Sequence, residues 1–365
     1  MQPVNVHLIA AARPNFMKIA PLYHALVREP WCRPQIVHTG QHYDANMSDA
    51  FFRDLRLPRP HFHLEVGSGT HAEQTGGVMV AYERVATAHR PDWIVVVGDV
   101  NSTAACALVG TKLWIPVIHL EAGLRSGDRR MPEEINRLVT DAICDVLWTP
   151  SPDADENLAR EGVPAAKIDR VGNIMIDSFE MMRGAIEGDG TRSGMGLEPG
   201  GYAVVTLHRP SNVDTREALE PLVRQLVAVS RELPLVFAVH PRTRRKLEEF
   251  GLLAALAAAS VRLTEPLGYI QFMNLVRSAR AVITDSGGVQ EESTYLGIPC
   301  LTLRENTERP VTVTEGSNRL VKPAELRAQV QEVLDGRWPT GRRPALWDGS
   351  TAQRCVAALR RRAGR

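Results

Sequence analysis

The strongest constraint on the fold is a repeated alternation of short apolar runs with longer amphipathic segments. Runs rich in valine and isoleucine in the first half predict strands over Val4–Ala11, Gln35–Thr39, Trp93–Gly98, Pro116–Leu120 and Val146–Thr149. Helical periodicity separates them over Asn15–Arg28, Ala72–Ala88, Ser102–Leu113 and Pro132–Ile143. Such alternation predicts a parallel sheet that helices cover on both faces.

The same alternation resumes after residue 200. Strands are expected over Tyr202–Leu207, Leu235–Val239, Ala281–Thr284 and Pro299–Leu303, and helices over Glu217–Ser230, Tyr269–Arg277 and Gly288–Leu296. The glycine-rich segment Gly188–Gly201 between the two series is the best candidate for a linker. We therefore expect an α/β protein with two Rossmann-like, doubly wound domains, residues 1–187 and 188–350, that face a central cleft. Residues 351–365 are expected to form a C-terminal helix that can dock on either domain, with the N-terminal domain favoured.

Composition narrows the functional classes. The 365 residues fit two domains of ordinary size, and 43 basic against 42 acidic residues give no electrostatic case for a nucleic acid or membrane partner. The five cysteines are odd in number and form no CxxC pair, which argues against a disulfide framework or a zinc site. No stretch approaches the ~20 apolar residues of a membrane helix. We expect a cytoplasmic protein without a metal.

Unusual polar residues follow several predicted strands, where loops build the active sites of α/β proteins. Arg13 and Lys18 follow the first strand and can meet an anion at a helix N-terminus, although both can also be ordinary surface cations. Asp99 follows a very apolar strand. Asn101 or Ser102 can cap the next helix, so capping and catalysis are equally good explanations of this loop on its own.

Three further carboxylates follow the next strand. Glu121 comes directly off a buried strand, and its simplest structural explanation is a salt bridge to Arg125. Glu133 and Glu134 lie in the first turn of a helix, where the helix dipole by itself favours negative charge. These residues are candidates for acid–base chemistry as well as for structural roles.

Two histidines and a charge run follow predicted strands in the second half. His208 and His240 each end a strand beside arginine or proline, and two such residues at matching positions favour a site over an isolated structural hydrogen bond. The run Arg304–Pro310 ends the next strand. It is either a solvated face or part of an anion site.

The strongest local signal is the segment Thr284–Glu292. A strand ends, the turn Ser286, Gly287 and Gly288 follows, and a helix begins. Backbone N–H groups at such a turn form an anion nest, and glycines let a phosphate approach. Glu292, one turn later, can reach a ribose hydroxyl. No Gly-Lys-Ser follows, so the segment is not a P-loop.

Taken together, these segments closely resemble the non-hydrolysing UDP-N-acetylglucosamine 2-epimerases. The resemblance spans Ala12 to Pro310 and depends on the strings GDVNST, HLEAGLRS, PEEINR, DSGGVQEE and RENTERP. The combination is specific, although no single string would be. The resemblance implies the GT-B arrangement of two Rossmann-like domains, in agreement with the organisation expected above.

The resemblance also implies roles for individual residues. The residues that hold UDP would be Arg13, His208, Ser286, Glu292 and Arg309, with Phe272 lining the uracil pocket. Lys18 would lie near the sugar or the phosphates. The catalytic carboxylates would be Asp99, Glu121 and Glu133, with His208 close to the diphosphate. The resemblance implies no metal and no nicotinamide, and it implies a homodimer.

The implied reaction explains this set of residues. No carbonyl acidifies the C2 proton of the sugar, so the C1–O bond breaks first and gives an oxocarbenium-like centre. Loss of the C2 proton then yields 2-acetamidoglucal and UDP, and re-addition with a proton on the other face gives the manno epimer. Two faces require two proton-handling groups. The alternatives are a hydrolysing epimerase that releases N-acetylmannosamine, a GT-B glycosyltransferase, and a nucleotide-sugar sensor without catalysis.

Some relatives in this family bind a second substrate molecule as an activator. Gln41, His42 and His240 match that pocket, whereas Asp44 and Ser68 replace a glutamine and an arginine. Because the arginine would meet the activator's diphosphate, we do not expect activation here.

Overall fold

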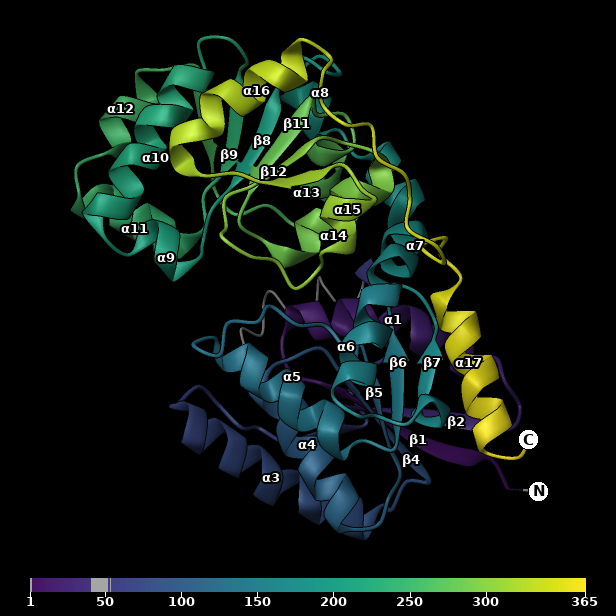
Figure 1. Cartoon of the computed structure of the whole chain (residues 1–365). Helices are drawn as coiled ribbons and strands as arrows, with labels where there is room; N and C mark the ends of the chain where they lie inside the picture. Colours follow the sequence, from purple (N-terminus) through teal and green to yellow (C-terminus); the bar gives the residue numbers. More distant parts are fainter. Residues whose placement is uncertain (1, 41–51, 53) are drawn as a thin grey trace. The chain divides into compact units, whose positions relative to one another are not determined.

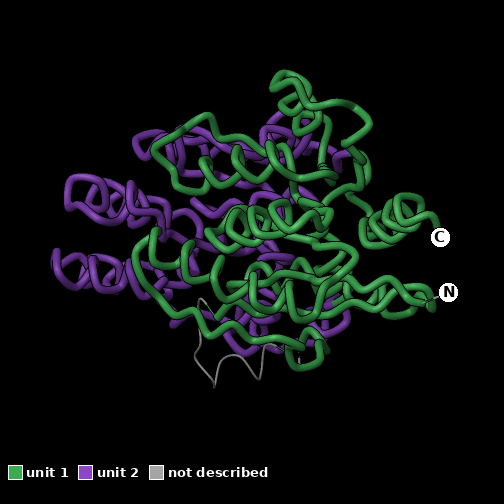
Figure 2. The backbone as a smooth tube through the Cα atoms, turned by 90° about the horizontal axis from the view of Figure 1, so that it is seen from below, with its two compact units in different colours: residues 1–181, 345–365 green, residues 182–344 purple. Residues whose placement is uncertain are grey.

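The computed structural model describes residues 2–40, 52 and 54–365, which form two compact α/β units (Figure 1). Unit 1 comprises Met1–Met181 and Ala345–Arg365, and unit 2 comprises Met182–Pro344 (Figure 2). Each unit contains one parallel sheet with helices on both faces. The predicted fold class, two doubly wound parallel α/β units, is confirmed.

Unit 1 contains a seven-stranded sheet in the order β3-β2-β1-β4-β5-β6-β7. Its strands are β1 (Val4–Ala10), β2 (Cys32–His38), β3 (Phe62–His63), β4 (Trp93–Val97), β5 (Val117–Leu120), β6 (Val146–Thr149) and β7 (Ile168–Arg170). Its helices are α1 (Arg13–Leu26), α3 (His71–Ala88), α4 (Asn101–Lys112), α5 (Pro132–Ile143), α6 (Pro152–Arg160) and α17 (Thr351–Arg362). A further helix, α7 (Ile174–Gly188), begins in unit 1 and ends in unit 2. Every neighbouring pair of strands is parallel.

The strand order of unit 1 reverses direction between β1 and β4. The chain passes from β1 outward to β2 and β3, and then returns to β4 on the other side of β1. In doubly wound sheets ligands bind outside the carboxyl ends of the strands at this reversal. Lys18 lies in α1, which follows β1, and Asp99 lies in the loop after β4, so the reversal brings together two segments that the sequence singled out.

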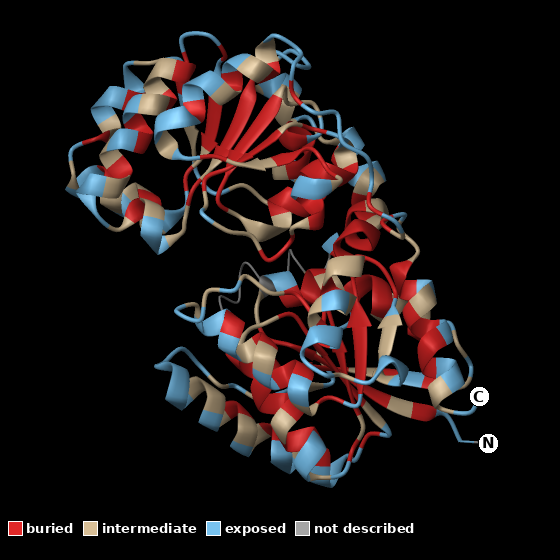
Figure 3. Ribbon diagram, viewed as in Figure 1, coloured by how far each residue is buried: buried red, intermediate tan, exposed pale blue. Residues whose placement is uncertain are grey.

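Close packing of α4 against the sheet positions the loop after β4. The central strands are buried (Figure 3). A Cβ added at Gly110 of α4 would lie 2.6 Å from Ile94 Cδ1 and 2.6 Å from Val117 Cγ2. Only glycine therefore lets α4 approach β4 and β5 this closely, and the N-terminus of α4 is held directly behind Asp99.

Unit 2 contains a six-stranded sheet in the order β10-β9-β8-β11-β12-β13, again with all neighbours parallel. Its strands are β8 (Ala203–Thr206), β9 (Leu235–Ala238), β10 (Val261–Thr264), β11 (Ala281–Thr284), β12 (Cys300–Thr302) and β13 (Asn318–Leu320). Its helices are α8 (Thr191–Gly194), α9 (Pro210–Val213), α10 (Arg216–Val229), α11 (Pro241–Glu249), α12 (Leu253–Ala257), α13 (Tyr269–Val276), α14 (Gly287–Leu296), α15 (Val311–Thr314) and α16 (Leu326–Leu334).

The reversal in unit 2 lies between β8 and β11. Thr206 at the end of β8 pairs in register with Thr284 at the end of β11. The loops that follow carry His208 and Ser286, so the histidine loop and the Ser-Gly-Gly turn are neighbours at the reversal. Phe237 and Leu226 belong to the apolar core that supports this sheet.

Four edge strands were not predicted: β3, β7, β10 and β13. They have two to four residues and are partly exposed, as in β10, where only the first of four residues is buried. Short, half-exposed strands show neither a continuous apolar run nor a long alternation.

The unit boundaries differ from those expected. They fall at 181/182 and 344/345 rather than at 187/188 and 350/351. The segment Gly188–Gly201, expected as a linker, lies inside unit 2 because Asn274 ties it down. Asn274 accepts a hydrogen bond from the Arg192 N–H at 2.9 Å and donates to the carbonyls of Ile186 and Asp189 at 2.8 Å.

The C-terminal helix α17 belongs to unit 1 and contacts α1. The Asp177 carboxylate accepts hydrogen bonds from the backbone N–H groups of Thr351 at 3.1 Å and Ala352 at 2.8 Å, which satisfies donors at the start of the helix. All five cysteines of the chain are buried free thiols. Within the described residues, no helix is both long and apolar enough to cross a bilayer.

Candidate functional site

Glu121 follows β5 with an unusual backbone conformation. Its φ of 72° lies in the left-handed region, which costs a non-glycine residue about 1–2 kcal/mol. The N–H groups of Glu121 and Ala122 both donate to the Trp148 carbonyl at 3.1 Å, and these bonds hold the strained turn. Such strain is concentrated at functional positions, which favours a catalytic role for Glu121.

The Glu121 carboxylate is buried and, among the described side chains, is paired with one cation. Its side chain is 3% exposed, and Oε2 forms an ion pair with Nζ of Lys18, which is 11% exposed. Oε1 has no hydrogen-bond partner among the described residues. The alternative salt bridge to Arg125 is not formed, because Arg125 pairs with Asp141 and Glu161 at 2.7 Å. Among the described residues, one oxygen of this buried carboxylate therefore has no donor.

Gly98 lets the chain pass close to this pair. Its φ is 70°, and an added Cβ would lie 3.3 Å from Lys18 Nζ and 3.6 Å from Glu121 Oε2. The next residue, Asp99, is thereby brought to the same end of the sheet. Its carboxylate is 32% exposed and forms an ion pair with Arg137, whose side chain is 2% exposed.

Helix capping does not explain the loop after β4. The residue at the N-cap of α4 is Val100, which has no side-chain cap. Asn101 donates to Gln74 Oε1 at 2.9 Å, and the Ser102 hydroxyl lies 3.0 Å from that of Thr39. Neither predicted cap residue serves the helix, so the capping alternative is wrong.

The two glutamates at the start of α5 have different environments. Glu134 is buried, accepts from the N–H groups of Ser126 at 3.0 Å and Gly127 at 2.8 Å, and pairs with Arg137 at 2.7 Å. Burial raises the pKa of Glu134, but these partners outweigh it and hold that pKa below its usual range. Glu133 is exposed, and its carboxylate has no hydrogen bond or ion pair within the described part of the chain. Glu134 is structural, and Glu133 is available for other contacts.

Arg137 was not singled out from the sequence. It bridges Asp99 and Glu134 and so connects the loop after β4 to the first turn of α5. The available signal was its spacing of three and four residues from two glutamates on one helix, which places them on the same face.

Some predicted residues fall outside what the structure describes. Gln41, His42 and Asp44 lie in the segment 41–51, outside the described residues, and the side chain of Arg13 is likewise not described. Ser68 is exposed.

Asp285 organises the histidine loop of unit 2. Its fully buried carboxylate accepts from the N–H groups of His208 and Arg209 at 3.0 and 2.9 Å, and from Asn212 Nδ2 at 3.0 Å. His208 Nδ1 lies 2.9 Å from Asp285 Oδ1. Burial raises the pKa of Asp285, but these bonds outweigh it and hold that pKa below its usual range. The His208 ring is thereby fixed with its other nitrogen available.

The Ser-Gly-Gly turn leads into α14. Ser286 is the N-cap residue, and its N–H donates to the Thr284 hydroxyl at 3.0 Å. A Cβ at Gly287 would lie 2.8 Å from both Arg309 Nη1 and Glu308 Oε1, whereas a Cβ at Gly288 would meet nothing within 4 Å. Gly287 is required by packing within the chain. Among the described residues, Gly288 has no such explanation.

Arg309 belongs to a buried charge cluster. Its guanidinium pairs with Glu291 and Glu308, both at 2.7 Å, and Glu308 also pairs with Arg304 at 2.7 Å. Burial raises the pKa of Glu308, but Arg309, Arg304 and Arg209 together hold that pKa well below its usual range. The run Arg304–Pro310 is therefore not a solvated face.

Glu292 and Phe272 lie on neighbouring helices of unit 2. Burial raises the pKa of Glu292 to about 8, with the Tyr269 hydroxyl opposing the shift and the Glu291 charge adding to it. Glu292 Oε1 has no hydrogen-bond partner among the described residues. Phe272, on α13 with Tyr269, is half-buried.

His240 has a local structural role. Its Nδ1 accepts from the Arg242 N–H at 3.2 Å and caps α11, and its ring centroid lies 5.7 Å from that of His208. Burial lowers the pKa of His240, and His208 and Arg242 lower it further. The Arg242 guanidinium is neutralised by two contacts with Asp214 at 2.5 and 2.6 Å.

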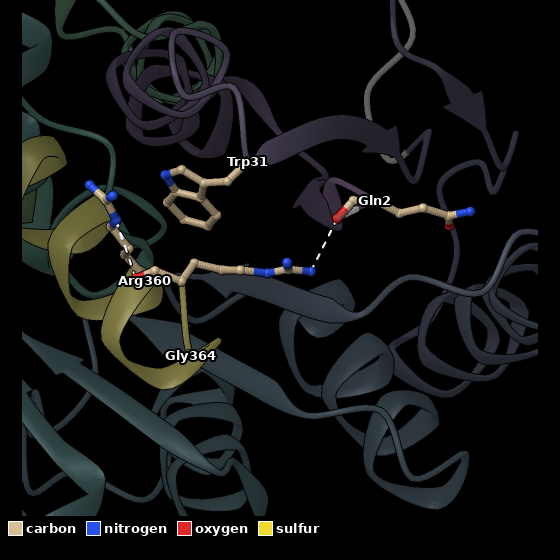
Figure 4. A pocket seen from close by; sticks show the side chains of 5 residues that line it. Gln2, Trp31, Arg360 and Gly364 are labelled. Atoms are coloured by element: carbon tan, nitrogen blue, oxygen red, sulfur yellow. Dashed lines mark hydrogen bonds between the residues drawn. The ribbon is translucent and has the colours of Figure 1, made fainter.

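A separate pocket in unit 1 lies near the two chain ends. Its lining residues are Gln2, Trp31, Arg360, Gly364 and Arg365 (Figure 4). Arg365 donates to the Gln2 carbonyl at 3.1 Å, and Arg360 donates to the Arg365 carbonyl at 3.3 Å. None of the predicted site residues lines this pocket. Among the described residues, no group of three or more histidine, cysteine, aspartate or glutamate side chains has metal-binding geometry.

Comparison with known proteins decides the family. The sequence profile of the UDP-N-acetylglucosamine 2-epimerases matches residues 24–360. The chain belongs to the UDP-N-acetylglucosamine 2-epimerase family. The predicted resemblance is confirmed.

Two curated relatives in this family show how similar its members are to the chain. A UDP-N-acetylglucosamine 2-epimerase of Methanocaldococcus jannaschii is 42% identical over 87% of this chain and 88% of its own length. A UDP-2,3-diacetamido-2,3-dideoxy-D-glucuronate 2-epimerase of Pseudomonas aeruginosa is 41% identical over 88% of this chain and 89% of its own length. Epimerases that are named for different UDP-sugars are therefore about equally similar to this one.

Solved structures agree with the family assignment. The crystal structure of the M. jannaschii UDP-GlcNAc 2-epimerase in complex with UDP-GlcNAc and UDP has a TM-score of 0.89 and is 40% identical, covering 98% of this chain and 99% of that one. The two-sheet architecture is thus that of the UDP-N-acetylglucosamine 2-epimerase family.

The Lys18–Glu121 pair of this epimerase gives a stability prediction. Lys18→Met leaves a buried carboxylate without its cation, so we expect the free energy of unfolding to fall by about 3 kcal/mol in urea denaturation. The double variant Lys18→Met/Glu121→Gln removes both charges and should lose less than the sum of the two single losses. Lys112→Met, at the exposed end of α4, is the control and should change stability by no more than about 0.5 kcal/mol. Additive single losses would contradict the pairing.

Proposed function

We propose that this protein reversibly epimerises UDP-N-acetylglucosamine at C2 to UDP-N-acetylmannosamine, by elimination of UDP to 2-acetamidoglucal and re-addition. The family match supports the reaction, and the observation that carries it is the carboxylate set of unit 1. Asp99 and Glu121 follow adjacent parallel strands, and each is paired with one cation.

The environments of the carboxylates suit proton transfer on two faces of C2. Glu121 is buried, is held on a strained backbone and has one oxygen without a partner among the described residues. Asp99 is partly exposed beside Arg137, and Glu133 is exposed. Groups in different environments are suited to opposite halves of an acid–base cycle. In this proposal, these three residues remove and return the C2 proton.

Unit 2 supplies groups for UDP in this proposal. The N-terminus of α14 offers backbone N–H groups at the Ser286–Gly288 turn, and anions bind favourably at such an end. Arg309 and His208 would stabilise the leaving diphosphate, while Glu292 binds the ribose and Phe272 lines the uracil site. The homodimer and the cytoplasmic location expected from the sequence stay predictions.

A second substrate has specific support. The P. aeruginosa relative is named for a UDP-2,3-diacetamido-2,3-dideoxy-D-glucuronate and is as similar to this chain as the M. jannaschii relative. The two sugars share the reacting C2 with its acetamido group, and they differ in the substituent at C3 and in the oxidation state of C6. The same carboxylates therefore serve either substrate, and turnover of both must be compared.

Proton NMR in deuterated water tests the reaction. We expect UDP-N-acetylglucosamine and UDP-N-acetylmannosamine to interconvert with deuterium entering at C2, because the proton is lost to a protein carboxylate that exchanges with solvent. The UDP-2,3-diacetamido-uronate is run in parallel at equal concentration and should be turned over more slowly. Free N-acetylmannosamine as the main product would favour a hydrolysing enzyme, and epimer without deuterium would rule out the elimination.

The carboxylates are tested one at a time. Asp99→Asn, Glu121→Gln and Glu133→Gln are each expected to lower kcat by about 10²-fold or more, which is the scale of general acid–base catalysis. Glu134→Gln is no control because it breaks buried contacts, so Glu217→Gln, on an exposed turn of α10, serves instead. The Kd for UDP should stay the same in all four. A kcat equal to that of wild type in all three site variants would show that these carboxylates do not transfer protons in the reaction.

Gly288 gives a test of the nucleotide site. An added Cβ at Gly288 meets nothing within 4 Å in the chain, so Gly288→Ala should leave the fold unchanged. If the diphosphate approaches this turn, the methyl group should raise the Kd for UDP about tenfold, equivalent to about 1.4 kcal/mol. Calorimetry measures the Kd, with Gly184→Ala, an exposed and equally open glycine of α7, as the control. Equal Kd values for both variants would show that the diphosphate does not approach this turn.

A further inference from the structure

A buried hydrogen-bond network joins the two loops that carry Asp99 and Glu121. His119 lies on β5 and Asp141 lies on α5, and their side chains are 0% and 1% exposed. His119 Nδ1 is 2.6 Å from Asp141 Oδ1, and His119 Nε2 is 2.8 Å from the Gly98 carbonyl oxygen. The histidine therefore connects α5 to the backbone immediately before Asp99.

Both ring nitrogens of His119 face acceptors. A carbonyl oxygen only accepts, and an ionised carboxylate only accepts, so each nitrogen must bear a hydrogen. Each nitrogen donates one short hydrogen bond, and the ring has no freedom to rotate.

The second oxygen of Asp141 holds the other loop. Asp141 Oδ2 accepts from the Gly123 N–H at 2.9 Å and from Arg125 Nη1 at 2.7 Å. Gly123 follows Glu121 by two residues. One carboxylate of α5 thus fixes the backbone beside Glu121 directly and the backbone beside Asp99 through His119.

These loops need such support because their backbone is locally unfavourable. Gly98, Glu121 and Gly123 all have φ between 70° and 80°. A Cβ at Gly123 would lie 2.5 Å from the Ala154 carbonyl oxygen, so this turn also packs tightly. Without the network, the free carbonyl of Gly98 and the N–H of Gly123 would be buried without partners, and the loops would relax.

We propose that His119 and Asp141 are positioning residues for the epimerisation: hydrogen bonds to the Gly98 carbonyl and the Gly123 N–H keep the Asp99 and Glu121 carboxylates in place. The proposal rests on the function proposed above for Asp99 and Glu121. Neither His119 nor Asp141 is exposed to substrate. Their effect is on the placement of proton-transfer groups, which governs kcat more than binding.

Two substitutions of His119 separate the two hydrogen bonds. The amide nitrogen of Gln can take the place of Nε2, and that of Asn can take the place of Nδ1. His119→Gln retains the bond to the Gly98 carbonyl, whereas His119→Asn retains only the bond to Asp141. We expect kcat to fall about 3- to 10-fold in His119→Gln and about 30- to 100-fold in His119→Asn, with KM within about 2-fold, on the scale of misplaced catalytic groups.

Asp141→Asn is a second variant that should fold. Its amide can donate to Nδ1 of a neutral ring while its oxygen still accepts from the Gly123 N–H, so every positioning bond is kept. We expect kcat within about 3-fold of wild type, since the hydrogen bonds and not the charges position the loops. A loss of 30-fold or more in this folded variant would overturn the proposal.

His7→Gln is the matched control. His7 is a fully buried histidine on β1 that contacts the Tyr82 hydroxyl at 3.1 Å, away from both loops. The His7→Gln variant should lower the melting temperature as much as the His119 variants do. Its kcat should stay within about 2-fold of wild type, as for a structural change outside the site. Equal kcat losses in His119→Asn, His119→Gln and His7→Gln would show general destabilisation instead.

A readout without turnover separates this proposal from the proposed function. The backbone amides of residues 98–101 should exchange hydrogen at least tenfold faster in His119→Asn than in His119→Gln. This difference is expected whichever UDP-sugar the wild type epimerises, and even if it epimerises neither. Equal exchange rates in the two variants would overturn the positioning role.

Discussion

The parallel pairing of β1 with β4, and of β8 with β11, is the constraint on which the rest of the structure depends. At each pairing the chain reverses its direction of winding, so the helices after the two strands lie on opposite faces of the sheet. The loops between them are left uncovered at the carboxyl edge. Asp99 and His208, which lie in these loops, are accordingly partly exposed.

Charge balance decides which of these polar residues are structural. Glu134, Asp141, Asp285 and Glu308 each have several partners, and those partners hold each pKa below its usual range. Carboxylates of this kind have a structural role. The candidate catalytic carboxylates differ in this respect: among the described residues, each forms an ion pair with one cation or with none. They are Asp99, Glu121 and Glu133. The number of partners therefore distinguishes candidate catalytic carboxylates from structural ones.

The central strands and their following loops were predictable because each depends on a local pattern. The bounds of α5 agree with the expected range, α17 covers Thr351–Arg362 of the expected 351–365, and Asp99, Glu121 and Ser286 lie at the strand ends where the sequence placed them. The pairing of side chains was not predictable. Lys18 and Glu121 are 103 residues apart in sequence, and Asp99 and Arg137 are 38 apart. The partner of each carboxylate depends on tertiary packing, and a short stretch of sequence carries no information on it. The same holds for Gly188–Gly201, whose composition is that of a linker but whose backbone Asn274 anchors.

The burial of all five thiols has a practical consequence. Burial raises the pKa of Cys32 to about 12 and that of Cys300 to about 11, so neither forms thiolate at neutral pH. The native chain is therefore expected not to react with maleimide reagents. A cysteine introduced at an exposed position such as Gly184 becomes the single labelling site, and pairs of such sites permit fluorescence measurements of motion during turnover without first removing any natural cysteine.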